Sequence, residues 1–272
     1  MSGGFFERLR ARIDTADSVL SVGLDTAVDR IPERLQGEEL PQWAFNRRII
    51  DATHEYAACY KPNLAFYESP AGWRALRETI AYAEGKGVPV LLDGKRADIG
   101  NTARQYATLL GEADAITVNP YLGRDAVEPF LQQADKGVFV LCRTSNPGGS
   151  EFQNLQVGND KRLFEYVAQR AAAWNQNDNV GLVVGATAPD ELERVRELVP
   201  ELPFLVPGVG SQGGDVAAAI EHGLTDEGVG VVNSSRGIIY AGADEQFEAA
   251  AASAAKRLTR RLNEHRRGGE QS

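Results

Sequence analysis

The stretch LLDGKRADIGNTARQYA, residues 91–107, gathers acidic and basic side chains directly after an apolar run. Asp93 and Lys95 are two positions apart, so on a strand their side chains point to the same side. Asp98 falls in the following loop or first helical turn, and Thr102 lies one turn later. Opposite charges keep each other ionised, and a lysine held protonated can stabilise negative charge or donate a proton.

Two earlier apolar runs also end in charged residues, Asp25 and Lys61. Neighbouring strands lie about 4.8 Å apart, so these two residues, Asp93 and Lys95 could form one charged wall. The alternative is an ion-pair network that only fixes the ends of the strands. Position favours a functional site, because the carboxyl ends of barrel strands carry the active site.

Eight short apolar runs alternate with helical patterns along the 272 residues. Continuous Val/Ile/Leu-rich runs are typical of strands that are covered on both faces, as in a parallel sheet. Eight such strands with intervening helices predict a (β/α)8 TIM barrel, and a doubly wound sheet is the alternative. The runs cover residues 19–25, 57–63, 89–95, 115–121, 137–143, 180–186, 204–210 and 228–234.

The chain shows no linker or shift of composition, so we expect one barrel domain over residues 1–272. Residues 3–14 are expected to form an extra helix before the first strand. From about residue 255 we expect a terminal helix with a solvated basic face and a flexible tail.

Composition narrows the classes of partner. The net charge of −9 argues against nucleic acid or an anionic membrane as the main partner, although one local cationic pocket could still bind a small anion.

Two cysteines, Cys59 and Cys142, suggest buried thiols in a reducing compartment. Without a signal-peptide pattern or a long apolar stretch, a cytoplasmic location is expected. The three histidines fall at no ligand spacing, so no metal site is expected.

Two segments near the end of the chain suggest a phosphate site. PGVGSQGGD, residues 207–215, contains Gly210 and Gln212, and its glycines let backbone N–H groups approach an anion. Arg236 follows the last expected strand, and barrels often bind phosphate after strands 7 and 8. The alternative for each segment alone is turn glycines and a surface arginine. After strand 5, residues 143–160 form a long polar loop of the kind that is usually functional or disordered.

Several of these segments resemble the orotidine 5'-phosphate decarboxylase family, in particular its longer, second subfamily. They occur in order through nearly the whole chain, each at the end of an expected strand: GLD (23–25), YKPN (60–63), DGKRADIGNT (93–102), RTSNPG (143–148), PGVGSQGGD (207–215) and NSSRGI (233–238).

The resemblance implies decarboxylation of orotidine 5'-monophosphate to uridine 5'-monophosphate without metal or cofactor. Lys95 would protonate pyrimidine C6, beside Asp93. Lys61 would contact Asp93 and the ribose, and Asp25 would hold a ribose hydroxyl.

The resemblance also implies roles at the ends of the substrate. Ser145 would contact the pyrimidine edge and Gln212 the phosphate, with part of the loop after strand 5 closing as a lid. Asn119 and Tyr121 could line the base pocket. The counterparts of Asp98 and Thr102 reach into the partner subunit's site, which implies a two-fold homodimer with composite sites.

Three other functions stay open. The DxKxxD motif also occurs in Mg2+-dependent sugar-phosphate decarboxylases and synthases, which need a metal-binding acidic residue where this chain has Lys61. A Schiff-base aldolase would need a neutral lysine, which the flanking carboxylates oppose. A non-catalytic phosphoribosyl-ligand binding protein could use the same scaffold.

Overall fold

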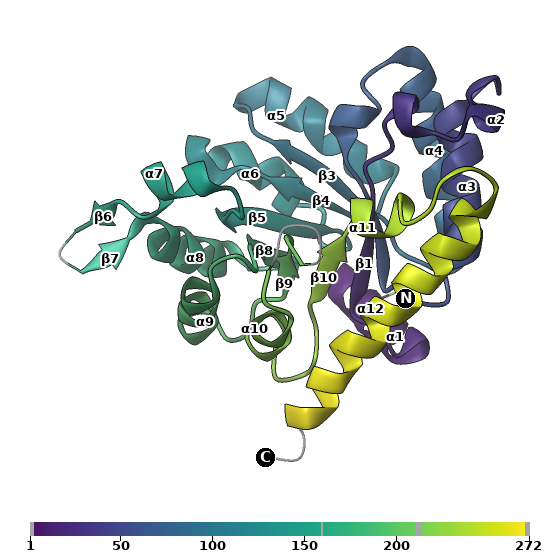
Figure 1. Cartoon of the computed structure of the whole chain (residues 1–272). Helices are drawn as coiled ribbons and strands as arrows, with labels where there is room; N and C mark the ends of the chain where they lie inside the picture. The colour runs from purple at the N-terminus through teal and green to yellow at the C-terminus, as the bar shows by residue number, and fades with distance from the viewer. Residues whose placement is uncertain (1–2, 159, 210–213, 270–272) are drawn as a thin grey trace.

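The computed structural model describes residues 3–158, 160–209 and 214–269. In this part of the chain, eight parallel strands form the barrel in the order β2-β1-β10-β9-β8-β5-β4-β3, with helices outside (Figure 1). The predicted (β/α)8 barrel is confirmed. The strands are β1 (Leu20–Leu24), β2 (Cys59–Pro62), β3 (Leu91–Arg96), β4 (Ala115–Val118), β5 (Gly137–Arg143), β8 (Val180–Val184), β9 (Phe204–Val206) and β10 (Val231–Ser234).

The barrel closes between β2 and β3 through only a few contacts. Two isolated parallel bridges, Tyr60 with Val90 and Asn63 with Asp93, join these strands. The N–H of Tyr60 also donates to the carbonyl of Pro89 over 3.0 Å. Asp93 thus lies where the first and last strands of the sheet order meet, beside the end of β2.

Helices cover the outside of the barrel, and their apolar faces pack on strands whose residues are buried on both sides. A small antiparallel hairpin, β6 (Gln156–Val157) with β7 (Lys161–Arg162), stands apart from the barrel. The helices are α1 (Phe5–Ala16), α2 (Glu33–Gln36), α3 (Pro41–Thr53), α4 (Pro70–Gly85), α5 (Gly100–Ala107), α6 (Arg124–Leu131), α7 (Ser150–Gln153), α8 (Leu163–Trp174), α9 (Pro189–Leu198), α10 (Val216–Glu221), α11 (Arg236–Ile239) and α12 (Phe247–Gly269).

The extra N-terminal helix, α1, packs against the start of β5. Phe5 and Phe6 meet Phe139 edge to face, with ring centroids 6.1 and 5.5 Å away. Gly137 leaves room for this contact, because a Cβ there would lie 2.3 Å from the Phe5 ring. The helix therefore seals the end of the barrel opposite the strand carboxyl ends.

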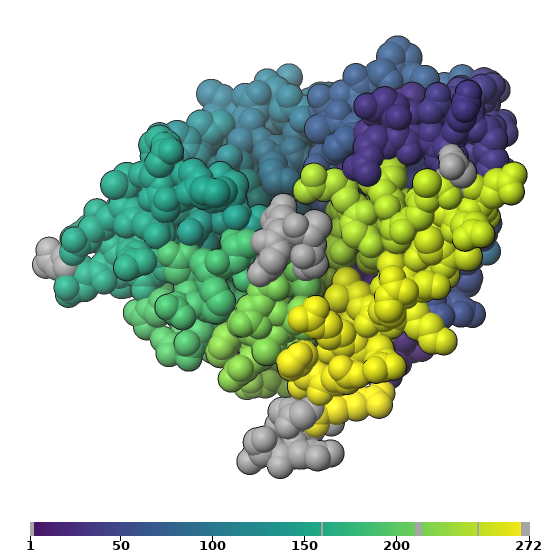
Figure 2. Space-filling view, in the orientation of Figure 1, coloured from purple at the N-terminus to yellow at the C-terminus, as the bar shows by residue number. Residues whose placement is uncertain are grey.

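The terminal helix differs from the expectation, because α12 begins at Phe247 rather than near residue 255. Phe247 stacks on Phe45 of α3 with ring centroids 5.1 Å apart, and Leu262 is fully buried. The helix crosses the outside of the barrel (Figure 2), so its apolar residues are part of the core rather than of a loose tail.

Both cysteines are buried and free, as expected. Burial raises the pKa of the Cys59 thiol to about 11. Among the described residues, no helix is long and apolar enough to cross a membrane.

Candidate active site

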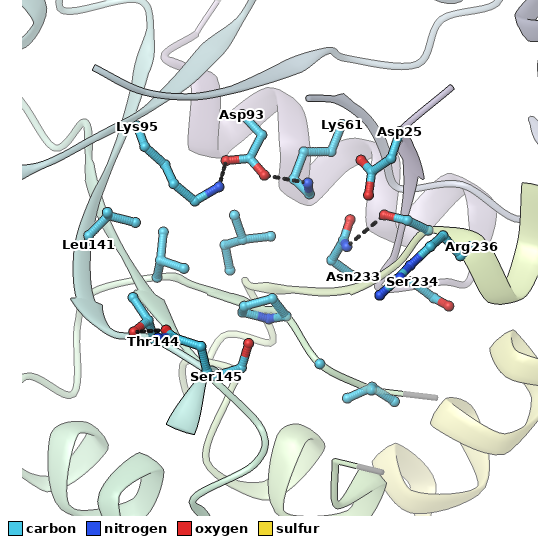
Figure 3. Close-up of a pocket in the computed structure, with 17 residues that line it drawn as sticks. Asp25, Lys61, Asp93, Lys95, Leu141, Thr144, Ser145, Asn233, Ser234 and Arg236 are labelled. Atoms are coloured by element: carbon cyan, nitrogen blue, oxygen red, sulfur yellow. Dashed lines mark hydrogen bonds and ion pairs between the residues drawn. The ribbon is translucent and has the colours of Figure 1, made fainter. Parts of the chain in front are cut away.

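Three charged side chains from β2 and β3 form one ion-pair cluster at the carboxyl end of the barrel (Figure 3). The ammonium of Lys61 lies 2.7 Å from Oδ2 of Asp93, and the ammonium of Lys95 lies 2.5 Å from Oδ1. One carboxylate is therefore shared between two ammonium groups. The charged wall predicted from the strand ends is present in the structure.

The backbone of β3 is irregular at the lysine. The pairing of β3 with β4 shifts register between Leu92 and Arg96, and Lys95 has a backbone φ of +45°. This left-handed conformation costs a residue other than glycine about 1–2 kcal/mol. The N–H of Lys95 donates to the hydroxyl of Thr117 on β4 (2.9 Å), and that hydroxyl donates to Oδ1 of Asp93 (3.0 Å). Thr117 thus holds both the bulge and the carboxylate.

Burial and charge fix the ionisation of the cluster. Burial alone would raise the pKa of Asp93, but the ammonium groups of Lys61 and Lys95 outweigh it and hold that pKa well below its usual range. For Lys61, burial opposes the charge, and the carboxylates of Asp93 and Asp25 more than compensate, so its pKa is raised. The side chain of Lys61 is only 4% exposed, whereas that of Lys95 is 47% exposed. Both ammonium groups line the cavity described below, and that of Lys95 is the more accessible.

Asp25, just after β1, adds a second carboxylate beside Lys61 (Figure 3). Its Oδ1 atom is buried and finds no hydrogen-bond donor among the described residues. The backbone of this turn is held by Tyr240, whose hydroxyl accepts from the N–H of Ala27 (2.9 Å) and donates to the carbonyl of Asp25 (3.2 Å). An unpaired buried acceptor at a fixed position is suited to receive a ligand hydroxyl.

The cluster faces a cavity of about 340 Å³. Its floor is apolar, and its far walls come from the ends of β5, β9 and β10, which supply hydroxyl, amide and guanidinium groups. Apart from Asp25, Lys61, Asp93 and Lys95, the lining consists of Leu141, Thr144, Ser145, Asn146, Val183, Leu205, Pro207, Gly208, Val209, Asn233, Ser234, Ser235 and Arg236. Cationic and carboxylate groups on one side and hydroxyl groups on the other suit a polar, anionic ligand of small size.

Six of the predicted site residues line this one cavity: Asp25, Lys61, Asp93, Lys95, Ser145 and Arg236. Ser145 follows β5, and Arg236 is the first residue of α11, directly after β10. The parallel strand ends bring them together although they are up to 211 positions apart, from residue 25 to residue 236.

Other predicted residues lie elsewhere. Asp98 precedes α5 and Thr102 lies on it, exposed, and neither lines the cavity. Asn119 caps the turn after β4 by accepting from the N–H of Tyr121 (3.0 Å), and both line a separate groove of about 1050 Å³ with α8. The expectation that Asn119 and Tyr121 line the base pocket is therefore not supported by their position. Gly210 and Gln212 lie outside the described residues.

Sequence reasoning missed several residues of the site. Thr117 was not singled out, although a polar residue inside the run AITV was a signal. Asn233 and Ser234 line the cavity, and Asn233 accepts from the hydroxyl of Ser21 over 3.1 Å. The motif NSSRGI contains these residues, but only its arginine was assigned a role.

Within the described part of the chain, no group of three or more His, Cys, Asp or Glu side chains could hold a metal ion.

Comparisons with known proteins agree with this geometry. The model of the family described as orotidine 5'-phosphate decarboxylase / HUMPS matches residues 18–252. The chain is 71% identical to an orotidine 5'-phosphate decarboxylase of Natronomonas pharaonis, over 96% of this chain and 99% of that protein. It is also similar to the solved structure of the Leishmania donovani OMP decarboxylase, with 44% identity, a TM-score of 0.84 and coverage of 97% and 99%. The L. donovani UMP synthase matches with 44% identity and a TM-score of 0.87, and the chain spans 57% of that longer protein. The chain belongs to the orotidine 5'-phosphate decarboxylase / HUMPS family.

Proposed function

We propose that this protein decarboxylates orotidine 5'-monophosphate to uridine 5'-monophosphate, a step of de novo pyrimidine biosynthesis in the cytoplasm. The observation that carries the proposal is the shared carboxylate of Asp93, which holds the ammonium of Lys95 at the edge of the cavity. The high identity to a named decarboxylase over nearly the whole chain supports the same reaction.

The chemistry follows from the charges. The bond between C6 and the carboxylate breaks, CO2 leaves, and the electron pair stays on C6. The ammonium of Lys95 stabilises this carbanion and then donates its proton to C6, and the resulting amine regains a proton from solvent. Asp93 and Lys61 are already paired in the free protein, so little reorganisation is needed during the reaction.

Substrate groups are assigned to the remaining walls of the cavity. Asp25 and Lys61 receive the ribose hydroxyls, Ser145 faces the pyrimidine edge, and Arg236 binds the phosphate together with the segment that contains Gly210 and Gln212. The phosphate lies far from C6, so its binding energy can drive closure of the site around the reacting carbon.

We also propose that the enzyme is a homodimer of single-domain subunits with composite sites. Asp98 and Thr102 lie outside the cavity of their own subunit, next to the exposed side chain of Ile99, which is 59% accessible. In a dimer these residues would complete the partner's site. Mixing an inactive Lys95→Ala subunit with an inactive Asp98→Ala subunit should restore about a quarter to a half of the activity per site, whereas no restoration would exclude composite sites.

The decisive experiment is turnover of orotidine 5'-monophosphate in excess EDTA, followed by ultraviolet absorbance. We expect conversion to uridine 5'-monophosphate by the wild type and by Lys86→Ala, which changes a surface lysine paired with Asp51, but not by Lys95→Ala. A folded dimer that fails to convert the substrate would contradict the proposal. Activity on a sugar phosphate with Mg2+ would then favour the synthase alternative, and tight binding without turnover would favour a binding protein.

A further inference from the structure

A second buried ion pair lies at the end of β5, outside the catalytic cavity. Arg143 is the last residue of β5 and is 8% exposed. Its Nε donates to the carboxylate of Glu191 in the first turn of α9. Neither residue lines the catalytic cavity, so the pair takes no direct part in the proposed chemistry.

The same arginine also contacts the segment that follows it, residues 144–162. Its Nη1 donates to the carbonyl of Thr144 (2.6 Å) and to the side-chain oxygen of Gln153 (3.3 Å). Gln153, at the end of α7, accepts from the N–H of Thr144 (2.9 Å) and donates to its hydroxyl (2.9 Å). Two residues nine positions apart are thus held together beside the guanidinium.

Glu191 connects further points of this segment. Its Oε1 accepts from the side-chain amide of Asn154 (2.9 Å) and lies 3.6 Å from the guanidinium of Arg162. One carboxylate of α9 therefore contacts Arg143 just before this segment, Asn154 in its middle and Arg162 at its end. The segment projects from the barrel (Figure 2).

The first residues of the segment 144–162 form part of the cavity wall. Thr144, Ser145 and Asn146 line the catalytic cavity directly after Arg143. The carbonyl of Ser145 accepts from the hydroxyl of Thr187 (3.1 Å), and a Cβ at Gly185 would lie 2.9 Å from its backbone. Ser145 thus lies two positions after Arg143, at the start of the segment that the ion pair contacts.

We infer that the Arg143–Glu191 pair positions the segment 144–154 before substrate arrives, so that Ser145 is already in place. This inference rests on the proposed function, in which Ser145 meets the pyrimidine. Arg143 and Glu191 are positioning residues, because they act through the segment and do not touch the ligand. Without the pair, substrate must order the segment, and ordering even one residue costs enough to weaken binding about tenfold.

Glu191→Gln tests this, because it keeps the volume and removes the charge. The matched control is Glu197→Gln on the same helix, whose partner Arg194 lies at the surface and contacts nothing in the segment. For Glu191→Gln we expect KM for orotidine 5'-monophosphate to rise about tenfold with kcat changed less than about threefold, since the chemical groups are intact. Glu197→Gln should match the wild type.

Hydrogen exchange supplies a readout that does not depend on turnover. In Glu191→Gln, amides of residues 144–154 should exchange faster in the free protein, saturating uridine 5'-monophosphate should restore their protection, and the barrel strands should be unchanged. Wild-type exchange and KM would overturn the inference, and so would faster exchange throughout the barrel, because the pair would then only support the fold. If Glu191→Gln does not fold, the double variant Arg143→Met/Glu191→Leu removes both charges of the pair and leaves no buried charge unpaired, and the same two outcomes apply. If the wild type itself does not turn over the substrate, the proposed function fails. Amide hydrogen exchange in the free protein then still tests whether the Arg143–Glu191 pair orders residues 144–154.

Discussion

Two buried ion-pair clusters stand at strand ends of the same barrel, and they differ in one respect. In the Lys61–Asp93–Lys95 cluster, the side chain of Lys95 is 47% exposed at the cavity. In the Arg143–Glu191 cluster, both side chains are at most 15% exposed, and neither lines the cavity. Burial and pairing are common to both. A member that is accessible from the cavity distinguishes the proposed catalytic cluster from the Arg143–Glu191 cluster.

The largest expected difference between the clusters is in kcat. Lys95→Ala removes both the proposed proton donor and the charge that we place beside C6, and kcat should fall by at least about 10⁴-fold. Arg143→Met removes a more deeply buried cation but no group that we expect to touch substrate, and kcat should fall by less than about tenfold. Steady-state rates at saturating substrate give both values. Equal losses of kcat would remove the distinction drawn between the clusters.

The second difference is in stability. Asp93→Asn leaves the buried ammonium of Lys61 without its shared counter-ion, and the free energy of unfolding should fall by about 3 kcal/mol. As a control, Glu112→Gln breaks the exposed pair with Arg77 and should leave the free energy of unfolding close to the wild-type value. Urea unfolding at neutral pH measures both. A value for Asp93→Asn as small as the control would mean that the cluster is held by other contacts.

The third prediction concerns the pH dependence of the free energy of unfolding. Because the pKa of Asp93 is depressed in the folded protein, its contribution to stability is complete above the ordinary aspartate pKa of about 4 and is lost as pH falls through the folded value. Because the pKa of Lys61 is raised, its contribution is complete below about pH 10 and is lost as pH rises through the folded value. The difference in unfolding free energy between wild type and Asp93→Asn should therefore stay constant from pH 5 to about pH 9 and shrink below about pH 4. A change across neutral pH would contradict the assigned charges.

The smallest effect concerns the backbone of the catalytic cluster alone. Lys95 has a left-handed φ, so Lys95→Gly should be about 1 kcal/mol more stable than Lys95→Ala, although both lack the ammonium. On a regular strand the order would be reversed, because glycine weakens strands. Thermal unfolding of the two inactive variants decides between these orders. Arg47, exposed on the regular helix α3, is a suitable site for the reversed control pair, because alanine is more favourable than glycine within a helix.

The sequence was sufficient to predict the barrel and the meeting of Asp25, Lys61, Asp93 and Lys95, because strand ends in a parallel barrel share one edge. The sequence was not sufficient to predict the register shift in β3 at Lys95, because a bulge depends on pairing with β4 rather than on a local sequence pattern. The contact between Arg143 and Glu191 could not be predicted either, because it joins residues that are 48 positions apart in the sequence.

Two other differences have local causes. The Ala-rich run at 249–255 is strongly helix-forming, so α12 begins before the expected residue 255. The polar residues 143–160 were expected to be a loop, yet they include α7 and β6, which are held by side-chain contacts that composition does not reveal.

The left-handed backbone at position 95 has a consequence for engineering this enzyme. A selection for thermal tolerance alone would favour glycine or asparagine there, since both adopt this conformation more readily than lysine does. Such variants would gain backbone stability and lose the proposed proton donor, which would be a trade-off between stability and activity confined to a single residue. Libraries for stabilisation should therefore hold position 95 fixed and seek improvement in the outer helices.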